Sequence, residues 1–339
     1  MASLYVEGYA DRLSYCPGEK ARLCVSTSAE RYAVEIARLG AVREVIWQRS
    51  DLPGVDYPVP EDASSQGCDW PISCEVEITA AWRSGYYEII LRAEDGGGKF
   101  VQRGRHTAES RGFFIVRPTE STTAKILLQL ATNTYAAYNN WGGFGLYAYH
   151  GRGLVQGHRV SFDRPMDGAI FDRWEKDFIE WIEGEGYVVD YCANSDLEFY
   201  PKLLKNYNLV LSVGHDEYWS EPMRDNLESF IDKGGNVAFF SGNSVCWQVR
   251  SEDEGRALVC WKQWYNMDPA FADKDFARLS TLWSHYLVDR PENHLTGVGF
   301  LHGGYHLSHG QYLDGSGAYE VHRPEHWVFK GTGLSRGDT

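Results

Sequence analysis

Asn208-Leu-Val-Leu-Ser-Val-Gly-His-Asp-Glu-Tyr-Trp-Ser220 carries the strongest fold signal in the chain. Its first part, residues 209–213, is a short apolar run with the length and β-branched content of a strand buried on both faces. Gly214 ends the run, and ionisable and aromatic residues follow it at once. Open α/β folds bind ligands at the carboxyl ends of their parallel strands. The stretch therefore predicts a buried parallel strand that leads into a functional site.

Strand and helix patterns alternate on both sides of this stretch. An apolar stripe at helical spacing covers residues 171–182, and Ser220 is placed to cap a helix that begins near Pro222. The other predicted strands are 125–130, 187–191 and 236–240. This alternation predicts that residues 123–339 form an α/β domain with a doubly wound, mostly parallel, flavodoxin-like sheet. From about residue 251 we expect irregular excursions packed on that domain.

Residues 1–118 have a different pattern, in which short apolar runs are separated by Gly, Pro, Asp and Ser. The predicted strands are 21–26, 32–39, 75–79, 86–92 and 113–116. Short strands at this spacing are typical of a β-sandwich of the immunoglobulin-like kind. The segment contains no catalytic constellation, so we expect it to buttress the second domain or to form oligomers.

Composition and charge narrow the function classes. The 339 residues carry a net charge of −14, which argues against a general nucleic-acid or anionic-membrane surface. No apolar run has the length of a transmembrane helix, and residues 1–8 lack the features of a signal peptide. The seven Cys contain no C-x-x-C pair. These features predict a reduced, cytoplasmic protein without a structural zinc.

Polar residues follow three of the predicted parallel strands, in loops 132–150, 214–219 and 241–247. If the strand ends converge, one crevice would hold two tyrosines together with His215, Glu217 and Asn243. Phenolate and carboxylate oxygens are hard ligands, and two tyrosinates with one glutamate match the charge of ferric iron. The tyrosines that could take part are Tyr135, Tyr138, Tyr147 and Tyr149.

Other interpretations of the same residues, mostly structural ones, stay open. The tyrosines could pack with their hydroxyls on ordinary partners, and His215 could simply cap the loop. Glu217 could pair with Arg224, and Asn243 could serve only the turn. Cys246 could act as a nucleophile with His302 or His306 as its base, although it lies late in its loop.

Five motifs then carry a family resemblance, which runs from about Lys125 to the C-terminus. They are Tyr135-Ala-Ala-Tyr-Asn-Asn-Trp-Gly-Gly, Gly145-Leu-Tyr, Gly214-His-Asp-Glu-Tyr-Trp-Ser, Gly234-Gly-Asn-Val-Ala-Phe-Phe-Ser-Gly-Asn and Glu325-His-Trp-Val-Phe-Lys-Gly-Thr-Gly-Leu. Together they resemble the large subunit of N,N-dimethylformamidase. That resemblance implies a glutamine-amidotransferase-like α/β domain beside a β-sandwich, and a mononuclear iron held by two tyrosines and a glutamate.

The resemblance also implies roles for individual residues. The iron ligands fall on Tyr138, Tyr147 and Glu217, with His215 and Asn243 behind them as catalytic residues. The loop between the two tyrosines looks shorter here than in the family, so Tyr135 or Tyr149 could replace one of them. The apolar wall for the substrate is expected from Trp141, Phe144 and Trp219.

The expected function is iron-dependent hydrolysis of the C–N bond of a small amide. The alternative is a non-catalytic module that binds carbohydrate or another small ligand on its aromatic rings. We expect a homo-oligomer and leave open a small accessory subunit. The C-terminal residues 331–339 contain no clear helix or strand pattern that would end the domain, so the chain could be truncated.

Overall fold

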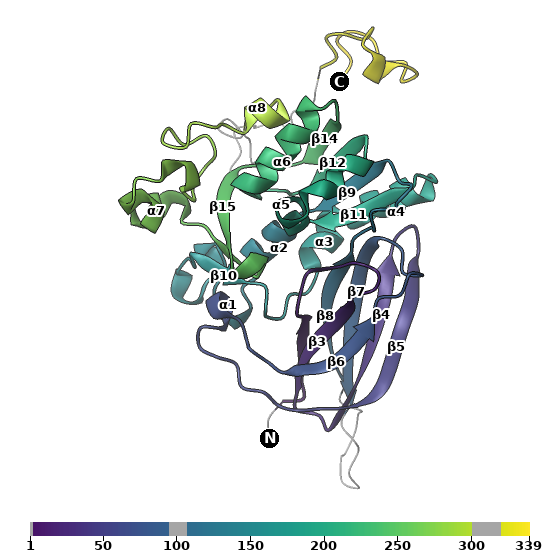
Figure 1. Cartoon of the computed structure of the whole chain (residues 1–339), viewed down its shortest axis with the longest axis vertical. Helices are drawn as coiled ribbons and strands as arrows, with labels where there is room; N and C mark the ends of the chain where they lie inside the picture. Colours follow the sequence, from purple (N-terminus) through teal and green to yellow (C-terminus); the bar gives the residue numbers. More distant parts are fainter. Residues whose placement is uncertain (1–2, 95–106, 300–319) are drawn as a thin grey trace. The chain divides into compact units, whose positions relative to one another are not determined.

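A computed structural model of the chain describes residues 3–94, 107–299 and 320–339. The chain divides into two compact units, Met1–Val298 and Gly299–Thr339. Figure 1 shows the first unit as a β-rich lower part that adjoins a region of mixed strands and helices. In the described residues no helix is both long and apolar enough to cross a membrane.

The N-terminal part of the first unit is built from two sheets. One sheet has the order β1-β3-β6 and the other β2-β8-β7-β4-β5. The strands are β1 Val6–Ala10, β2 Ser14–Tyr15, β3 Lys20–Thr27, β4 Arg31–Leu39, β5 Arg43–Pro53, β6 Ile72–Glu77, β7 Gly85–Glu94 and β8 Thr107–Val116. Apart from the parallel contact of β2 with β8, neighbouring strands in these sheets are antiparallel.

Alternating side chains of these strands form one core between the two sheets. Leu23 and Val25 on β3 and Ile89 and Leu91 on β7 belong to the same buried cluster. Strand residues point alternately to opposite faces, so alternate residues of β3 and β7 enter this core. The predicted sandwich is therefore observed, although β1 and the exposed edge strand β5 lay outside the predicted strands.

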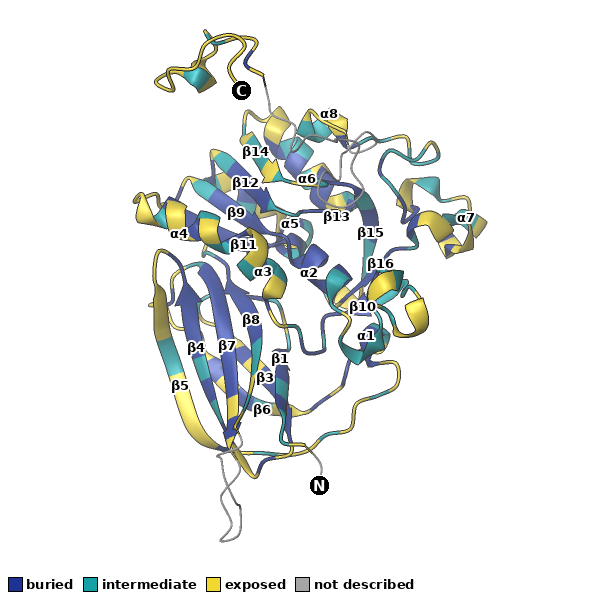
Figure 2. Ribbon diagram, turned by 180° about the vertical axis from the view of Figure 1, so that it is seen from behind, coloured by how far each residue is buried: buried dark blue, intermediate teal, exposed yellow. Residues whose placement is uncertain are grey.

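The central sheet of the first unit is parallel and has the order β11-β9-β12-β14. Its strands are β9 Ile126–Leu130, β11 Val189–Ala193, β12 Leu209–Gly214 and β14 Asn236–Ser241. Strands β9, β11 and β12 are mostly dark blue in Figure 2, because residues on both of their faces are buried. The carboxyl end of β12 thus lies between those of β9 and β14.

The remaining strands form a fourth sheet that the sequence pattern did not predict. Its order is β10-β16-β15-β13, with β10 Arg159–Ser161, β13 Tyr218–Ser220, β15 Trp247–Glu252 and β16 Ala257–Val259. Only β13 and β15 run parallel, whereas the other two pairs are antiparallel. Strands of three residues carry too few positions for a visible alternation, so the segment looked irregular in the sequence.

The predicted doubly wound, mostly parallel, flavodoxin-like fold is wrong. Within the described residues the strands form four sheets, and only the β11-β9-β12-β14 sheet is parallel throughout. Helices are also few and short, since the longest in that part of the chain has 12 residues. The strand–helix alternation between residues 125 and 241 correctly predicted the parallel strands of the central sheet. It could not predict the antiparallel pairing of β10, β15 and β16.

Most helices pack around the parallel sheet and its loops, whereas α1 contacts β10 and α7 lies among the 3-10 turns after β16. They are α1 Ala63–Gln66, α2 Thr132–Tyr138, α3 Ala169–Trp174, α4 Lys176–Gly184, α5 Asn194–Phe199, α6 Glu221–Asp232, α7 Pro269–Ala272 and α8 Asn293–Thr296, with a 3-10 helix η4 at Pro201–Asn206. Ser220 caps α6 as predicted, because its Oγ accepts the Met223 N–H at 3.4 Å. The single helix predicted over residues 171–182 is divided at Glu175 into α3 and α4.

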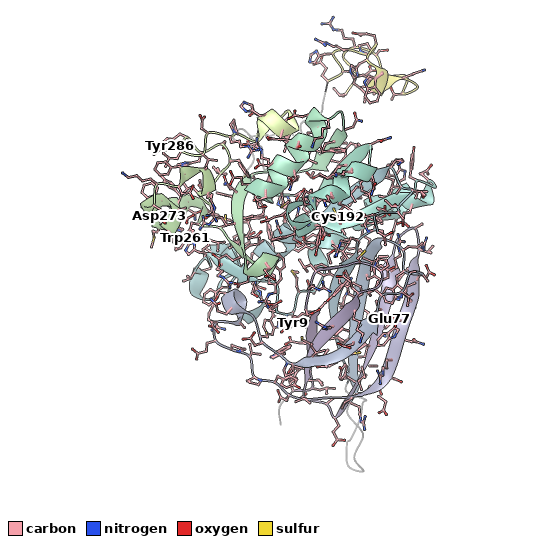
Figure 3. The ribbon with its side chains drawn as sticks, viewed as in Figure 1. Tyr9, Glu77, Cys192, Trp261, Asp273 and Tyr286 are labelled. Atoms are coloured by element: carbon pink, nitrogen blue, oxygen red, sulfur yellow. The ribbon has the colours of Figure 1, made fainter. Side chains whose placement is uncertain are left out.

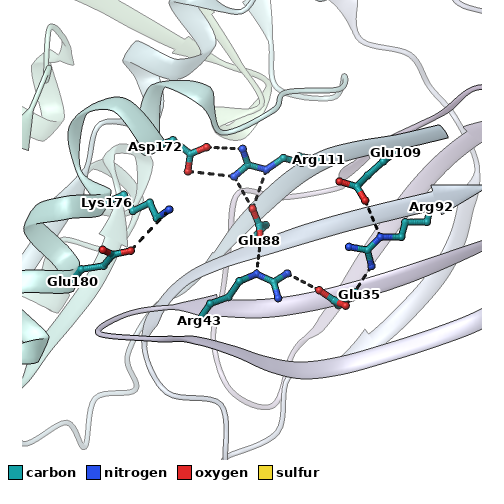
Figure 4. A network of polar contacts seen from close by, with 9 residues as sticks. All are labelled: Glu35, Arg43, Glu88, Arg92, Glu109, Arg111, Asp172, Lys176 and Glu180. Carbon is teal, nitrogen blue, oxygen red and sulfur yellow. Dashed lines mark hydrogen bonds and ion pairs between the residues drawn. The ribbon is translucent and has the colours of Figure 1, made fainter. Parts of the chain in front are cut away.

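The sandwich and the parallel sheet share a buried boundary. Tyr86 on β7 stacks on Phe171 of α3 with ring centroids 3.7 Å apart, and both residues are fully buried. A charged network continues this boundary (Figure 4), in which Arg111 on β8 bridges Glu88 on β7 and Asp172 on α3. This boundary supports the expected buttressing role of the sandwich, since α3 and α4 rest on its larger sheet.

In the second unit the described residues 320–339 contain a short 3-10 helix, Trp327–Phe329, and otherwise turns. Backbone bonds link Val321 to Gly337 and Asp338, which closes this segment on itself.

Candidate functional site

Four of the predicted site residues meet at the carboxyl ends of β9 and β12. Tyr138 is the last residue of α2, which follows β9, and Tyr147 lies further along the same connection. His215 and Glu217 come directly after β12. Because β9 and β12 are hydrogen-bonded neighbours, their two loops face each other, as the sequence predicted.

Glu217 is the centre of this cluster. The Tyr147 hydroxyl donates to its two carboxylate oxygens at 2.9 and 2.8 Å, and the Tyr138 hydroxyl donates to Oε2 at 3.3 Å. Trp247 Nε1–H donates to Oε1 at 2.9 Å. The Glu217 side chain is only 4% exposed, so its carboxylate depends on these donors rather than on water.

His215 supports both Glu217 and Tyr138. Its Nδ1 lies 3.1 Å from the Gly242 carbonyl, which only accepts, so this nitrogen carries a proton. Its Nε2 lies 3.1 Å from Glu217 Oε2 and 3.2 Å from the Tyr138 hydroxyl. A neutral His215 therefore accepts the Tyr138 proton in place of Glu217, whereas a protonated His215 donates to Glu217 and leaves the Tyr138 proton to that carboxylate. This geometry lets His215 exchange a proton at Nε2.

The electrostatics of the cluster keep Glu217 charged and the tyrosines neutral. Burial raises the pKa of Glu217, but hydrogen bonding by His215 and the charges of His215 and Lys262 outweigh it and leave that pKa lowered. Burial, reinforced by the negative charge of Glu217, raises the pKa of both Tyr138 and Tyr147. The two phenols can ionise at neutral pH only beside a strong positive charge.

Lys262 is a site residue that the sequence reasoning missed. Its ammonium lies 3.3 Å from the centroid of the Tyr147 ring and 5.2 Å from that of Trp247. The side chain is buried and its Nζ has no hydrogen-bond partner among the described residues. Burial lowers the pKa of Lys262 to about 8, although Cys260 and Glu217 oppose this. The aromatic faces are therefore its main stabilising contacts.

The sequence around Lys262 does not predict that its side chain is buried beside Tyr147. Trp261, labelled in Figure 3, stacks on His158 with ring centroids 4.1 Å apart and so anchors the backbone next to Lys262. Lys262 itself has a φ of 53°, a rare value for a residue with a side chain. In the sequence, only its aromatic neighbours separated it from an ordinary surface lysine.

Buried polar contacts hold the loop after β12 in place. The Asp216 carboxylate accepts from Gln129 of β9, Asn194 of α5 and Ser212 of β12, at 2.7, 3.2 and 2.8 Å. Asp216 thus points away from the cluster, as its alternation with His215 and Glu217 predicts. The Tyr218 side chain instead points toward the cluster, because its ring lies edge-on to the Tyr147 ring with centroids 6.4 Å apart.

Gly214 is required where β12 meets this loop. Its φ of 83° lies in the left-handed region, and a Cβ there would come within 2.7 Å of the Trp174 Cβ. Trp174 in turn stacks on His215 with ring centroids 5.7 Å apart. The glycine therefore lets the loop turn sharply while Trp174 covers one face of His215.

Arg164 organises the connection between Tyr138 and Tyr147. Its guanidinium is fully buried and donates to the carbonyls of Asn139, Trp141 and Phe144, while its Nε donates to Ser161. Burial lowers the pKa of Arg164 to about 10, so the side chain stays charged at neutral pH. One cation thus donates hydrogen bonds to three carbonyl groups of the loop that carries both tyrosines.

Replacing Arg164 by Lys is expected to destabilise the protein by at least about 2 kcal/mol, because an unmet buried carbonyl costs roughly 1–3 kcal/mol. A lysine cannot reach all four carbonyls from one ammonium. Differential scanning calorimetry of R164K beside the exposed control R152K measures the effect. An unchanged melting temperature for R164K would contradict this role.

The three residues expected to form a substrate wall do not share one surface. Trp219 is fully buried in the core beneath the parallel sheet and donates to the Asp216 carbonyl at 3.1 Å. Trp141 donates to Glu7 of β1 at 3.1 Å and packs edge-on to Trp70. Only Phe144 remains half-buried in the loop beside the tyrosines. Trp219 is thus a core residue in this fold, and Trp141 faces the sandwich.

Asn243 lies in the turn after β14 with a φ of 52°, a conformation that Asn tolerates better than most residues. The neighbouring residues connect this turn to the site, because the N–H groups of Cys246 and Trp247 both donate to the Glu217 carbonyl. The Asn243 backbone therefore lies in a turn bonded to the Glu217 loop, and a catalytic role for its side chain stays a proposal.

The alternative assignments have clear positions as well. Tyr135 is buried and donates to Glu175 at 2.6 Å, and Tyr149 is 61% exposed beside Tyr147. Arg224 pairs with Glu228 at 2.7 Å rather than with Glu217. Cys246 is buried, which raises the pKa of its thiol and disfavours a nucleophilic role. Its two suggested bases, at positions 302 and 306, lie outside the described residues.

The donor set of the cluster fits a hard, highly charged cation. In the described part of the chain no group of three or more His, Cys, Asp and Glu side chains is placed to bind a metal. A metal at this site would therefore need the phenol oxygens of Tyr138 and Tyr147, which both point at Glu217. The two phenols resist ionisation unless a strongly charged cation lies beside them. A site of one carboxylate and two such phenols therefore suits ferric iron better than zinc.

Similarity to known proteins indicates a family for the chain. The family model described as N,N-dimethylformamidase beta subunit-like, C-terminal, matches residues 33–339. The chain is 23% identical to the N,N-dimethylformamidase beta subunit of Alcaligenes sp and 24% identical to that of Paracoccus aminophilus, each over 232 residues. Each match covers 55% of this chain and 29% of the relative. A family 123 glycoside hydrolase from Clostridium perfringens matches with a TM-score of 0.15 and 6% identity, too low to indicate a shared fold.

Proposed function

The chain belongs to the N,N-dimethylformamidase beta subunit-like family, as its sequence motifs predicted, and we propose that it hydrolyses the C–N bond of a small amide at an iron site. The chain spans 29% of the length of the curated relatives it matches, so their activity supports this proposal only by analogy. The observation that carries the proposal is the convergence of Tyr138 and Tyr147 on the buried Glu217 carboxylate.

In this proposal Tyr138, Tyr147 and Glu217 hold the iron. When bound, ferric iron supplies Lewis acidity for an amide carbonyl and for water. His215 would take a proton from the attacking water at Nε2, which faces Glu217 and Tyr138, and would deliver it to the departing amine nitrogen. The Gly242 carbonyl fixes the orientation of the His215 ring throughout. Asn243 is proposed to position water or the carbonyl oxygen from the adjoining turn.

The exposure of the cluster favours a small substrate. The side chain of His215 is 15% exposed and that of Glu217 is 4% exposed, so the cluster opens to solvent mainly at the histidine. Trp174, which is 40% exposed and stacks on His215, provides an apolar surface at this opening. A short N-alkyl amide suits such an opening better than a peptide does. Hydrolysis of N,N-dimethylformamide against a dipeptide amide tests this preference, and faster peptide cleavage would refute it.

Lys262→Met is expected to lower kcat by about 10- to 30-fold, because a desolvated cation–π contact is worth roughly 2 kcal/mol. The ammonium covers one face of Tyr147 and fixes that ring against Glu217. Iron content should stay near that of the wild type, while the tyrosinate-to-iron absorption band shifts. The exposed Lys274→Met serves as the control. A normal kcat with an unshifted band would show that Lys262 only fills space.

We also propose that the chain works within an assembly of several subunits, since both curated relatives are named as beta subunits. A homo-oligomer and a small accessory subunit are both compatible with that name. Light scattering on the purified chain, alone and after co-expression with candidate small subunits, measures the assembly. A monomer with full amide-hydrolase activity would contradict this proposal.

A further inference from the structure

A cavity of about 670 Å³ lies at the amino ends of β12 and β14, at the opposite end of the parallel sheet from Glu217. It is lined by η4, by the last turns of α6, which Figure 1 shows beside β12 and β14, and by the turn that leads into β14. This volume lies within the range of small-molecule sites, about 300–1,000 Å³. The cavity is separate from the tyrosine–glutamate cluster and shares no lining residue with it.

The rim of this cavity is positively charged. Lys202 and Lys205 on η4 and Lys233 after α6 are exposed, and none of the described residues that line the cavity is acidic. Lys233 donates to Ser229 at 2.8 Å, whereas Lys202 and Lys205 make no ion pair with any residue that the structure describes. In a chain with a net charge of −14, three lysines without an acidic partner create a local site for an anion.

The floor of the cavity is apolar. Leu204, Tyr207 and Phe230 line it and are 4%, 5% and 9% exposed. A Cβ at Gly235 would come within 2.3 Å of the Phe230 ring, so glycine allows the ring to lie flat against the turn. The cavity therefore combines a cationic rim with a hydrophobic floor, the pattern of a site for a molecule with one charged end.

We propose that this cavity binds a small amphipathic anion, with a carboxylate or phosphate group on Lys202, Lys205 and Lys233 and an apolar body over Phe230. Each exposed lysine contributes little by itself, but three around one anion act together. The apolar body gains free energy by covering the floor. Carboxylate and phosphate carry the same chemistry here, and the choice between them is left to the test.

Isothermal titration of the purified chain with octanoate, octyl phosphate, octanol and inorganic phosphate tests the proposal. At least one of the two charged octyl compounds should bind, and octanol should bind at least about tenfold more weakly. The tighter of the charged pair identifies the head group. Equal binding of octanol, or binding of inorganic phosphate as tight as that of octyl phosphate, would overturn the amphipathic site, and so would no binding of any probe.

The variant K202S/K205S/K233S should weaken binding of the charged compound at least about tenfold, because three contributions of about 0.5 kcal/mol sum to that factor. The control K274S removes one exposed lysine elsewhere and should bind normally. Since the three lysines are exposed, the triple variant should fold, and its unchanged melting temperature verifies this. Unchanged affinity in a folded triple variant would contradict the assignment.

Discussion

Glu217→Gln is expected to lose the bound iron and to lower amide hydrolysis by at least about 100-fold, since even residues behind a metal ligand cost 10- to 100-fold when removed. The substitution keeps one oxygen for the donors Tyr147 and Trp247, so the fold should survive. It removes the negative charge that a ferric ion needs. Elemental analysis and N,N-dimethylformamide turnover, measured on the same preparation, give the result.

Glu185→Gln is the matched control, because it makes the same chemical change on an exposed side chain. It should leave both iron and turnover as in the wild type. A Glu217→Gln protein that keeps stoichiometric iron would show that the carboxylate is not a ligand. A protein that loses iron but keeps full turnover would show instead that the metal has no part in catalysis.

Glu175→Gln is expected to produce the largest change in stability. Glu175 is fully buried at the α3–α4 junction, where its Oε1 accepts from Tyr135 at 2.6 Å and from the Ala131 N–H at 3.3 Å. Its Oε2 has no partner among the described residues. Burial, aided by the charge of Asp216 and opposed by the two donors, raises the pKa of Glu175 from its ordinary value of 4.5 to about 8.

The sign of the pH effect follows from this shift. Between pH 4.5 and about 8 the folded state holds a proton on Glu175 that the unfolded state has lost, so the free energy of unfolding falls as pH rises. The whole change is on the order of 5 kcal/mol. Glutamine cannot ionise, and Glu175→Gln should therefore match the wild type near pH 4.5 and be more stable at pH 8.

Denaturant unfolding at pH 5 and pH 8 measures this difference. Glu180→Gln, on the exposed face of α4, should keep the pH dependence of the wild type. If Glu175→Gln loses stability between these pH values as steeply as the wild type does, the carboxyl of Glu175 is not the titrating group.

The sequence predicted the parts of the fold that depend on local pattern. The apolar run 209–213 followed by Gly214 became β12 and its loop, and Ser220 became the cap of α6. Parallel strands bring their carboxyl ends together, so the meeting of Tyr138, Tyr147, His215 and Glu217 followed from the strand order. The strand, cap and convergence predictions needed only periodicity, caps and sheet geometry, whereas the family resemblance implied the choice of Tyr138 and Tyr147 among the four tyrosines.

The errors came from contacts between distant segments. Lys262 enters the site because the segment after β16 places its ammonium over the Tyr147 ring, and no local sequence pattern predicts that contact. Trp219 follows the site motif in sequence, yet it turns into the core with Met223 and Leu227 of α6. The parallel sheet was taken as the whole architecture because the three-residue strands of the fourth sheet are too short to show a period.

Iron content and electronic absorption of the purified chain test the central claim most directly. The account predicts about one iron per chain and a visible tyrosinate-to-iron band that weakens in Tyr147→Phe, together with hydrolysis of N,N-dimethylformamide. A protein that hydrolyses the amide without metal, or one that binds carbohydrate and contains neither metal nor hydrolase activity, would contradict it.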